Sequence, residues 1–146
     1  MVQTKIPLSQ VAEEAWESYV PDTPYLSGGT LNYAKYKKIG KTVHYRIKYT
    51  LSGANISGPA SFSLPVAAHA DYAQSDYEPI GTVILRDTGV NGVTAHAMWA
   101  TGQYIAIRIM KADSTYVTNV TNVSSAVPFT WGSGDQIYIQ GTYEAA

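Results

Sequence analysis

Residues 42–51, Thr-Val-His-Tyr-Arg-Ile-Lys-Tyr-Thr-Leu, alternate polar and apolar side chains without a break. Successive side chains of an extended chain point to opposite faces, so these residues would form one apolar and one polar side. In a helix the same residues would spread charge over every face. The pattern therefore predicts a strand with one buried and one solvated side. The apolar side consists of Val43, Tyr45, Ile47, Tyr49 and Leu51.

The residues before this strand predict its partner. Residues 31–39 are followed by Gly40 and Lys41. A glycine that opens a two-residue turn is typical of a tight β-hairpin, because the first turn position needs a positive φ. A loop of odd length would turn Lys35 and Lys37 toward the apolar side, which costs more than like charges in register. The predicted register pairs Ala34 with Ile47, Lys35 with Arg46, Tyr36 with Tyr45 and Lys37 with His44.

Six further segments have strand-like patterns and are separated by turns rich in glycine, proline, serine and asparagine. They are residues 60–66, 82–86, 93–99, 103–110, 116–123 and 137–143. With the hairpin they give about eight short strands at regular spacing. This spacing predicts an all-β fold, an antiparallel two-sheet β-sandwich that resembles a jelly roll.

Residues 9–19 form the one segment with a helical pattern. Good helix formers follow a capping Ser9, and Ala12, Trp16 and Tyr19 recur at helical spacing. Such a short helix with a narrow apolar stripe is marginal alone, so we expect it to dock on the domain, a neighbouring subunit or a larger assembly. The predicted organisation is a docking segment with a short N-terminal helix, residues 1–24, and a sandwich domain, residues 25–146.

Composition restricts the possible partners. Ten lysines and arginines against eleven acids give a net charge of -1, so no overall field attracts nucleic acid. The chain has no cysteine, no apolar secretion signal and no apolar run long enough to cross a bilayer. We expect a soluble chain made in a cytoplasm. Twelve tyrosines against two phenylalanines favour surfaces that bind other molecules.

Positive charge gathers on the predicted hairpin, which holds six of the ten basic residues: Lys35, Lys37, Lys38, Lys41, Arg46 and Lys48. One interpretation is a lysine-guarded edge that discourages stray strand pairing. The other is a face for an anionic partner, such as the acidic side of the N-terminal segment from the same or a neighbouring subunit. On the second interpretation the docking residues are Glu13, Glu14, Trp16, Glu17, Lys35, Lys37, Arg46 and Lys48.

The long loop of residues 67–79 holds the remaining candidates for chemistry. His69, Asp71, Asp76 and Glu78 match no calcium loop and no zinc motif, so a solvated loop is favoured over a metal site. No nucleophile elbow, phosphate loop or buried acid pair is visible, and we expect neither enzymatic activity nor a cofactor. The loop also carries Tyr72 and Tyr77, which we expect to be exposed and able to stack on a glycan. Trp99 and Trp131 border strands, which favours core or interface positions.

Four stretches share the spacing of turn and strand residues of a known module: residues 28–51, which begin Gly-Gly-Thr-Leu-Asn-Tyr-Ala-Lys-Tyr; residues 58–66, Gly-Pro-Ala-Ser-Phe-Ser-Leu-Pro-Val; residues 128–146, which begin Pro-Phe-Thr-Trp-Gly-Ser-Gly; and the opening Trp-Glu-Ser-Tyr-Val-Pro of residues 16–21. They resemble a β-sandwich module of tail-fibre and other minor structural proteins of tailed bacteriophages. The resemblance implies a domain displayed on a virion, commonly as a homotrimer, for attachment or decoration. In that family the module usually ends a long fibre. Here residues 1–22 precede it, which leaves room for a small head or tail decoration protein.

The resemblance also implies partners, which are other copies of the chain and other virion proteins. The tyrosines that we expect to be exposed add a host cell-surface glycan as a candidate partner. The charge balance and the lack of a long apolar run indicate neither nucleic acid nor membrane insertion. The first alternative is a carbohydrate-binding module for host receptor recognition, and a weaker one is a glycan-cleaving enzyme.

Overall fold

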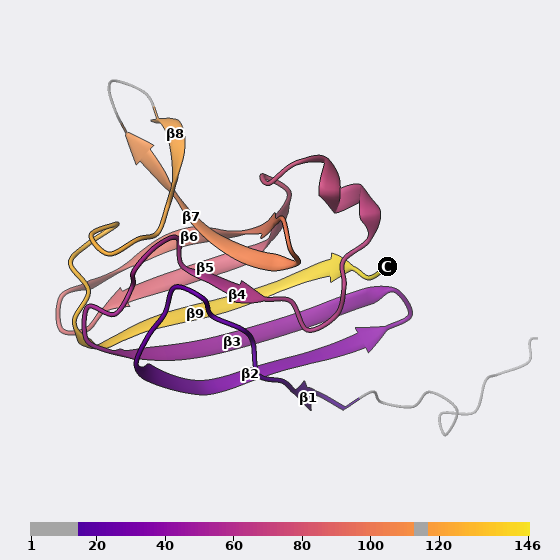
Figure 1. The fold of residues 1–146 in the computed structure, drawn as a ribbon, viewed down its shortest axis with the longest axis horizontal. Coiled ribbons are helices and arrows are strands. Elements are labelled where there is room, and N and C mark those ends of the chain that lie inside the picture. Colours follow the sequence, from indigo (N-terminus) through magenta and orange to yellow (C-terminus); the bar gives the residue numbers. More distant parts are fainter. Residues whose placement is uncertain (1–14, 113–116) are drawn as a thin grey trace, which may run out of the picture.

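The computed structural model of the chain describes residues 15–112 and 117–146 (Figure 1). The described chain is all-β, as predicted, with nine strands and one short 3-10 helix. The elements in chain order are β1 (Glu17–Ser18), β2 (Gly29–Ile39), β3 (Thr42–Ser52), β4 (Ser61–Ser63), η2 (Ala70–Gln74), β5 (Pro79–Asp87), β6 (Asn91–Ala100), β7 (Tyr104–Ala112), β8 (Val117–Asn122) and β9 (Ser133–Glu144).

All nine strands belong to one antiparallel sheet. Its order is β1-β2-β3-β9-β5-β6-β7-β4, with β8 also paired to β7. We predicted two separate sheets, but the hydrogen-bonded order has no break. The reason is the C-terminal strand β9, which pairs with β3 along one side and with β5 along the other.

The sheet curls so that its two ends approach each other. Ser63 of β4 donates its backbone N–H to the Asp22 carbonyl at 2.9 Å, and Ser63 Oγ accepts from the Asp22 N–H at 2.8 Å. On the inner face the ring of Phe62 lies edge-on to Tyr49 of β3, with centroids 5.9 Å apart. The curl therefore encloses one core between the two halves of the sheet.

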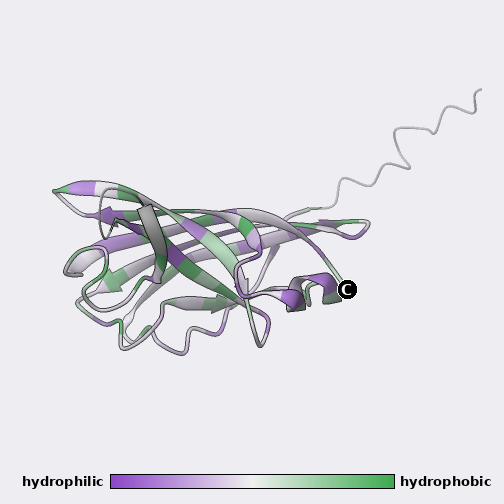
Figure 2. Ribbon diagram, turned by 90° about the horizontal axis from the view of Figure 1, so that it is seen from above, coloured by the Kyte–Doolittle hydropathy of each residue, from purple (hydrophilic) through white to green (hydrophobic). Residues whose placement is uncertain are grey.

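The hairpin prediction is confirmed in detail. β2 and β3 pair as expected, with Lys35 opposite Arg46 and Lys37 opposite His44, and Gly40 has a φ of +59°. The five residues of the predicted apolar side of β3 are all buried. Figure 2 shows the resulting alternation of hydrophobic and hydrophilic residues along the strands. The alternation of polar and apolar residues along β3 thus determines which face of the sheet is open to solvent.

The predicted helix over residues 9–19 lies mostly outside the described residues. Its last part is described, and there the helix prediction is wrong, because Glu17–Ser18 forms strand β1. Tyr19 continues this contact by donating its N–H to the Ala34 carbonyl at 3.1 Å. The free edge of β2 supplies hydrogen-bond partners that a final helical turn close to Pro21 would lack. Residues 17–19 therefore pair with the edge of the sheet.

The core contains large side chains from both halves of the sheet, such as Ile47, Phe62, Leu85 and Ile107. Trp99 and Trp131 are buried too, which confirms the expected core positions. Strand β4 is shorter than predicted and ends before Pro65, which lacks the N–H that a ladder needs. The inner face is filled, so binding must use the outer face, the loops or the edges.

Candidate binding face

The outer face of the sheet carries a row of polar and basic side chains. Strand register places these residues side by side across seven strands, from β2 through β3, β9, β5, β6 and β7 to β8. The row contains three cations and no carboxylate. Its members are Lys35, Arg46, Gln140, Thr82, His96, Arg108 and Asn122.

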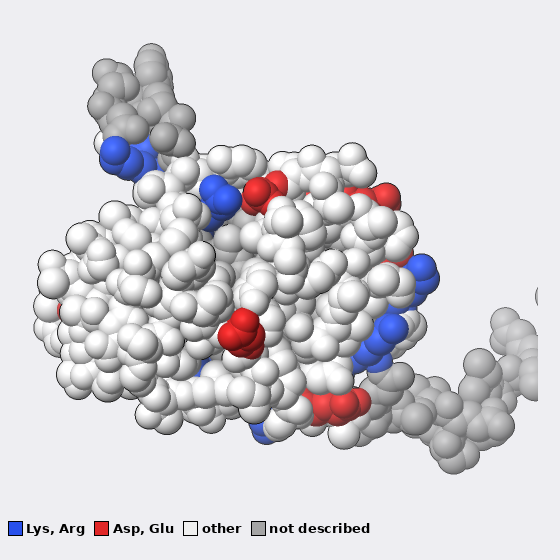
Figure 3. All heavy atoms as spheres, viewed as in Figure 1, with Lys and Arg blue, Asp and Glu red and all other residues white. Residues whose placement is uncertain are grey.

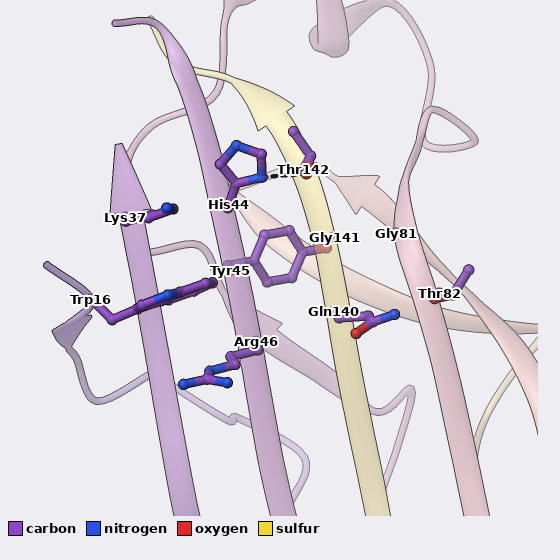
Figure 4. A pocket seen from close by; sticks show the side chains of 10 residues that line it. All are labelled: Trp16, Lys37, His44, Tyr45, Arg46, Gly81, Thr82, Gln140, Gly141 and Thr142. Atoms are coloured by element: carbon purple, nitrogen blue, oxygen red, sulfur yellow. Dashed lines mark hydrogen bonds between the residues drawn. The ribbon is translucent and has the colours of Figure 1, made fainter. Parts of the chain in front are cut away.

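A hollow of about 510 Å³ lies over β2, β3, β9 and β5 (Figure 4). Trp16 reaches it from the N-terminal segment and lies across β2 toward β3, as Figure 4 shows. The other outward-facing side chains that line the hollow are polar, and most can donate hydrogen bonds. They are Lys37, His44, Arg46, Thr82, Gln140 and Thr142. A hollow of this size is within the range of about 300–1,000 Å³ for ligand pockets.

Cations of this face lie against aromatic rings. The Arg46 guanidinium carbon is 4.7 Å from the centroid of the Trp16 ring and 5.7 Å from that of Tyr33. The Lys48 ammonium is 5.1 Å from the centroid of Tyr138. Ring faces attract cations at these distances and hold the long side chains in place. We call Trp16, Tyr33, Arg46, Lys48 and Tyr138 the cation-aromatic cluster.

The positive charge of this cluster is not neutralised within residues 15–112 and 117–146. No ion pair is found there between a carboxylate and Lys35, Lys37, Arg46 or Lys48, all of which lie on the outer side of β2 and β3. The remaining basic residues of the hairpin, Lys38 and Lys41, are exposed, and Figure 3 shows basic side chains at that end of the molecule. The face can therefore receive an anionic group.

Two glycines form the floor of the hollow. Gly81 of β5 and Gly141 of β9 lie opposite each other, and the Tyr45 side chain extends past Gly141 to donate to the Ile80 carbonyl at 3.1 Å. A Cβ on Gly141 would be 2.0 Å from the Ile80 oxygen and 2.6 Å from the Tyr45 hydroxyl oxygen. The sheet therefore needs a glycine here for Tyr45 to cross. On the outer side, His44 Nδ1 and the Thr142 hydroxyl lie 3.0 Å apart.

Tyrosine hydroxyls beneath this face stay protonated. Burial raises the pKa of Tyr45 well above its ordinary value, and nearby Tyr19 and Tyr143 raise it further. Burial likewise raises the pKa of Tyr143, although its bond to the Val66 backbone opposes the shift. These phenols therefore add no negative charge under the basic face at neutral pH.

The predicted docking residues are partly brought together. Trp16, Lys37 and Arg46 line the same hollow, and the Lys37 ammonium is 5.9 Å from the centroid of the Trp16 ring. Glu17 is not on this face: it lies opposite Tyr36 and accepts a hydrogen bond of 2.8 Å from the Tyr36 hydroxyl. Glu13 and Glu14 lie outside the described residues.

Sequence reasoning missed Tyr33, Tyr138 and Gln140 on this face. The alternation of polar and apolar residues in 136–143 already places Tyr138 and Gln140 on the side of β9 away from the core. The sequence does not reveal which strand pairs with β9. The pairing of Tyr138 with Lys48 joins segments ninety residues apart in the chain.

The two predicted glycan-stacking tyrosines differ in exposure. Tyr77 is 56% exposed, and the Arg108 guanidinium carbon is 4.6 Å from its ring centroid. The expectation of an exposed Tyr72 is wrong: it is half-buried, packs on the core, and its hydroxyl accepts from the Glu144 N–H at 3.2 Å. Tyr72 is anchored because η2 folds over the end of β9.

The loop of residues 67–79, considered above as a metal site, holds His69 and Asp71, whose Nδ1 and Oδ2 atoms are 3.3 Å apart. Asp76 lies apart from this pair and accepts from the Thr101 N–H and hydroxyl. In the described part of the chain, no group of three or more histidines and acids is placed to hold a metal ion. None of the described helices is long and apolar enough to cross a membrane.

The fold and this face define an all-β protein whose free sheet surface is basic and aromatic. No family model, curated protein or solved structure matches the chain.

Proposed function

We propose that the chain is a non-enzymatic structural protein of a tailed-bacteriophage virion, made in the host cytoplasm. The curled sheet is displayed on the particle as a β-sandwich. It serves either to assemble the particle or to attach the particle to a host. The chain acts as a homo-oligomer, a trimer, on a head or tail. An N-terminal docking segment joins it to its neighbours.

The observation that carries this proposal is the position of Trp16. The N-terminal segment is the proposed docking element. Its described end carries Trp16, whose ring lies beside Lys37 and Arg46 on the basic face. Aromatic and arginine side chains are enriched at protein interfaces and dominate their binding energy. A carboxylate from a neighbouring subunit would neutralise the unpaired positive charge of this face.

The test is complementation. A phage lacking this gene is grown on cells that express the wild-type chain or a variant, and gradient-purified virions are analysed by quantitative immunoblot. We expect the wild-type chain in the virions and about tenfold less of the double variant Arg46→Glu/Lys48→Glu, which reverses two charges of the cluster. The control Arg86→Glu reverses an exposed charge outside the hollow and should leave incorporation unchanged.

Two results would oppose the proposal. Absence of the wild-type chain from purified virions removes the structural role altogether. Equal incorporation of the double variant, with a wild-type circular dichroism spectrum, keeps the role but removes this face as the docking surface.

A second candidate is a carbohydrate-binding module for host receptor recognition. The exposed ring of Tyr77 favours it, because flat aromatic surfaces with polar tips suit sugar rings. Titration with glycans while intrinsic fluorescence is recorded distinguishes it from a purely assembly role.

A further inference from the structure

A second pocket, of about 460 Å³, lies on the outer face over β4 and β7. Strand pairing brings its walls together, since Ser61 lies opposite Ala106 and Arg108 opposite Asn122. Aromatic and proline side chains form much of the wall, and no carboxylate of residues 15–112 or 117–146 lines it. The residues used below are Tyr25, Ser61, Thr101, Tyr104, Arg108 and Asn122.

Among the residues that the structure describes, Arg108 is the one cation that lines this pocket. Its Nε atom is enclosed by protein and has no hydrogen-bond partner, and no ion pair to its guanidinium is found among the described residues. The Tyr77 ring lies against this guanidinium, with its centroid 4.6 Å from the guanidinium carbon. An anionic ligand would therefore gain from a charge that the chain leaves uncompensated.

Two carboxylates are hydrogen-bonded to residues of the pocket wall. Asp22 Oδ2 accepts from the Tyr104 hydroxyl at 2.6 Å, which fixes the Tyr104 ring at the pocket wall. Asp76 Oδ1 accepts from both the N–H and the hydroxyl of Thr101. Neither acid pairs with Arg108. The two acids hold the wall in place and leave the guanidinium to a ligand.

Tyr25 supplies a flat surface beside this charge. It is 42% exposed, and its ring packs on Gly58, where an added Cβ would be 2.5 Å from Tyr25 Cδ1. Glycine at position 58 thus lets the ring lie close against the backbone. A ring held in this way loses little conformational entropy when a ligand stacks on it.

We propose that this pocket binds a carboxylated sugar, of the kind found in acidic polysaccharides. The carboxylate pairs with the Arg108 guanidinium, whose fork of donors matches carboxylate geometry. The apolar side of the sugar ring lies against Tyr25, and its hydroxyls bond to polar groups of Ser61, Thr101 and Asn122. The inference rests on the second candidate function, carbohydrate recognition, and is independent of the assembly role.

A sugar fits this pocket better than an acidic peptide. Extended peptides gain affinity by pairing with a free strand edge. The edge of β7 at this pocket is already taken, by β4 next to Ala106 and by β8 next to Arg108. The pocket therefore offers ring surfaces and one cation, with no backbone ladder.

The experiment is calorimetric titration of the full chain with trigalacturonic acid and, in parallel, with neutral galactotriose. We expect saturable binding of the acidic trisaccharide that is at least tenfold tighter than that of the neutral one. Arg108→Gln should weaken acidic binding at least tenfold, and Arg108→Lys should weaken it less, because lysine keeps the charge but not the fork. The control Arg86→Gln removes an exposed charge that lines neither hollow and should bind as the wild type does.

Each contrary outcome has a defined meaning. Equal binding of acidic and neutral sugars overturns the inference but keeps carbohydrate recognition, whereas binding of neither removes both. Equal binding of a tri-glutamate peptide shows that any carboxylate suffices and overturns the sugar assignment. If Arg108→Gln loses the wild-type circular dichroism spectrum, Arg108→Lys decides the question: unchanged binding in that folded variant overturns the inference.

Discussion

Replacing Gly141 by alanine tests whether the close approach of β5, β9 and Tyr45 determines stability. The added methyl group would be 2.0 Å from the Ile80 carbonyl oxygen, 2.6 Å from the Tyr45 hydroxyl oxygen and 2.8 Å from its Cζ. Ile80 lies at the register shift between Pro79 and Gly81, and its carbonyl is restrained because the next residue, Gly81, pairs with both β6 and β9. Either the two strands separate or the Tyr45 ring leaves its position.

The magnitude follows from two terms. Overpacking a well-filled site costs about 1–3 kcal/mol. Displacing the Tyr45 hydroxyl from the Ile80 carbonyl leaves a buried donor without a partner, which costs about 1–3 kcal/mol more. We therefore expect Gly141→Ala to lower the free energy of unfolding by about 2–6 kcal/mol. At about 3 °C per kcal/mol for a chain of this size, the melting temperature falls by about 6–18 °C.

The assay is urea unfolding followed by tryptophan fluorescence, since Trp99 and Trp131 are buried and report loss of the core. The matched control is Gly92→Ala in β6, where the nearest atom to an added Cβ is the Leu85 carbonyl oxygen at 3.7 Å. That substitution should change the free energy of unfolding by less than about 1 kcal/mol, because glycine to alanine at an unstrained position is mildly stabilising.

A double variant separates the two obstacles to the methyl group. Tyr45→Phe removes the hydroxyl but leaves the Ile80 oxygen at 2.0 Å, so Gly141→Ala should stay strongly destabilising in the Tyr45→Phe background. The reasoning is refuted if the double variant is as stable as Tyr45→Phe alone. The backbone of β5 would then be no obstacle, and the approach of the two strands would not require glycine.

Two further predictions concern ionisation and a buried acid. The free energy of unfolding should fall as the pH rises above about 10, because the unfolded chain releases phenol protons there while Tyr19, Tyr45 and Tyr143, whose pKa values are raised by burial, retain theirs. Urea unfolding between pH 8 and 11 measures the slope, at most about 1.4 kcal/mol per pH unit per tyrosine, and a curve that stays flat contradicts it. Asp135→Asn should cost about 1–3 kcal/mol, because its two oxygens accept from the N–H groups of Thr88 and Gly132 and an amide has one oxygen. An unchanged melting temperature would show that these bonds add nothing.

Sequence reasoning succeeded where the determining interactions are local. Alternation in residues 42–51 is a property of one strand, and Gly40 fixes the hairpin register within a few residues, so both could be predicted. The helix prediction over residues 9–19 failed in its described part for a non-local reason. Glu17–Ser18 follows the open edge of β2, and no spacing within the segment reveals that edge.

The candidate sites show the same division. Trp16, Lys37 and Arg46 could be proposed together because charge and aromatic content gather in neighbouring segments. The Arg108 pocket could not, since it requires β4 and β8 to pair with the same strand, β7. Arg108 also lies in a stretch whose isoleucines at 105, 107 and 109 dominate its pattern. Its enclosed, unpartnered Nε is visible only in three dimensions.

The single-sheet topology explains how one face can hold two separate binding sites. Arg46 and Arg108 belong to the same cross-sheet row, but β9, β5 and β6 lie between β3 and β7. Four inter-strand steps of about 4.8 Å give about 19 Å along the sheet, which exceeds the Debye length of about 8 Å at physiological salt. Exposed charges at that separation are largely screened from each other. A ligand at one arginine therefore gains little from the other, and variants of Arg46 and Arg108 test two separate sites.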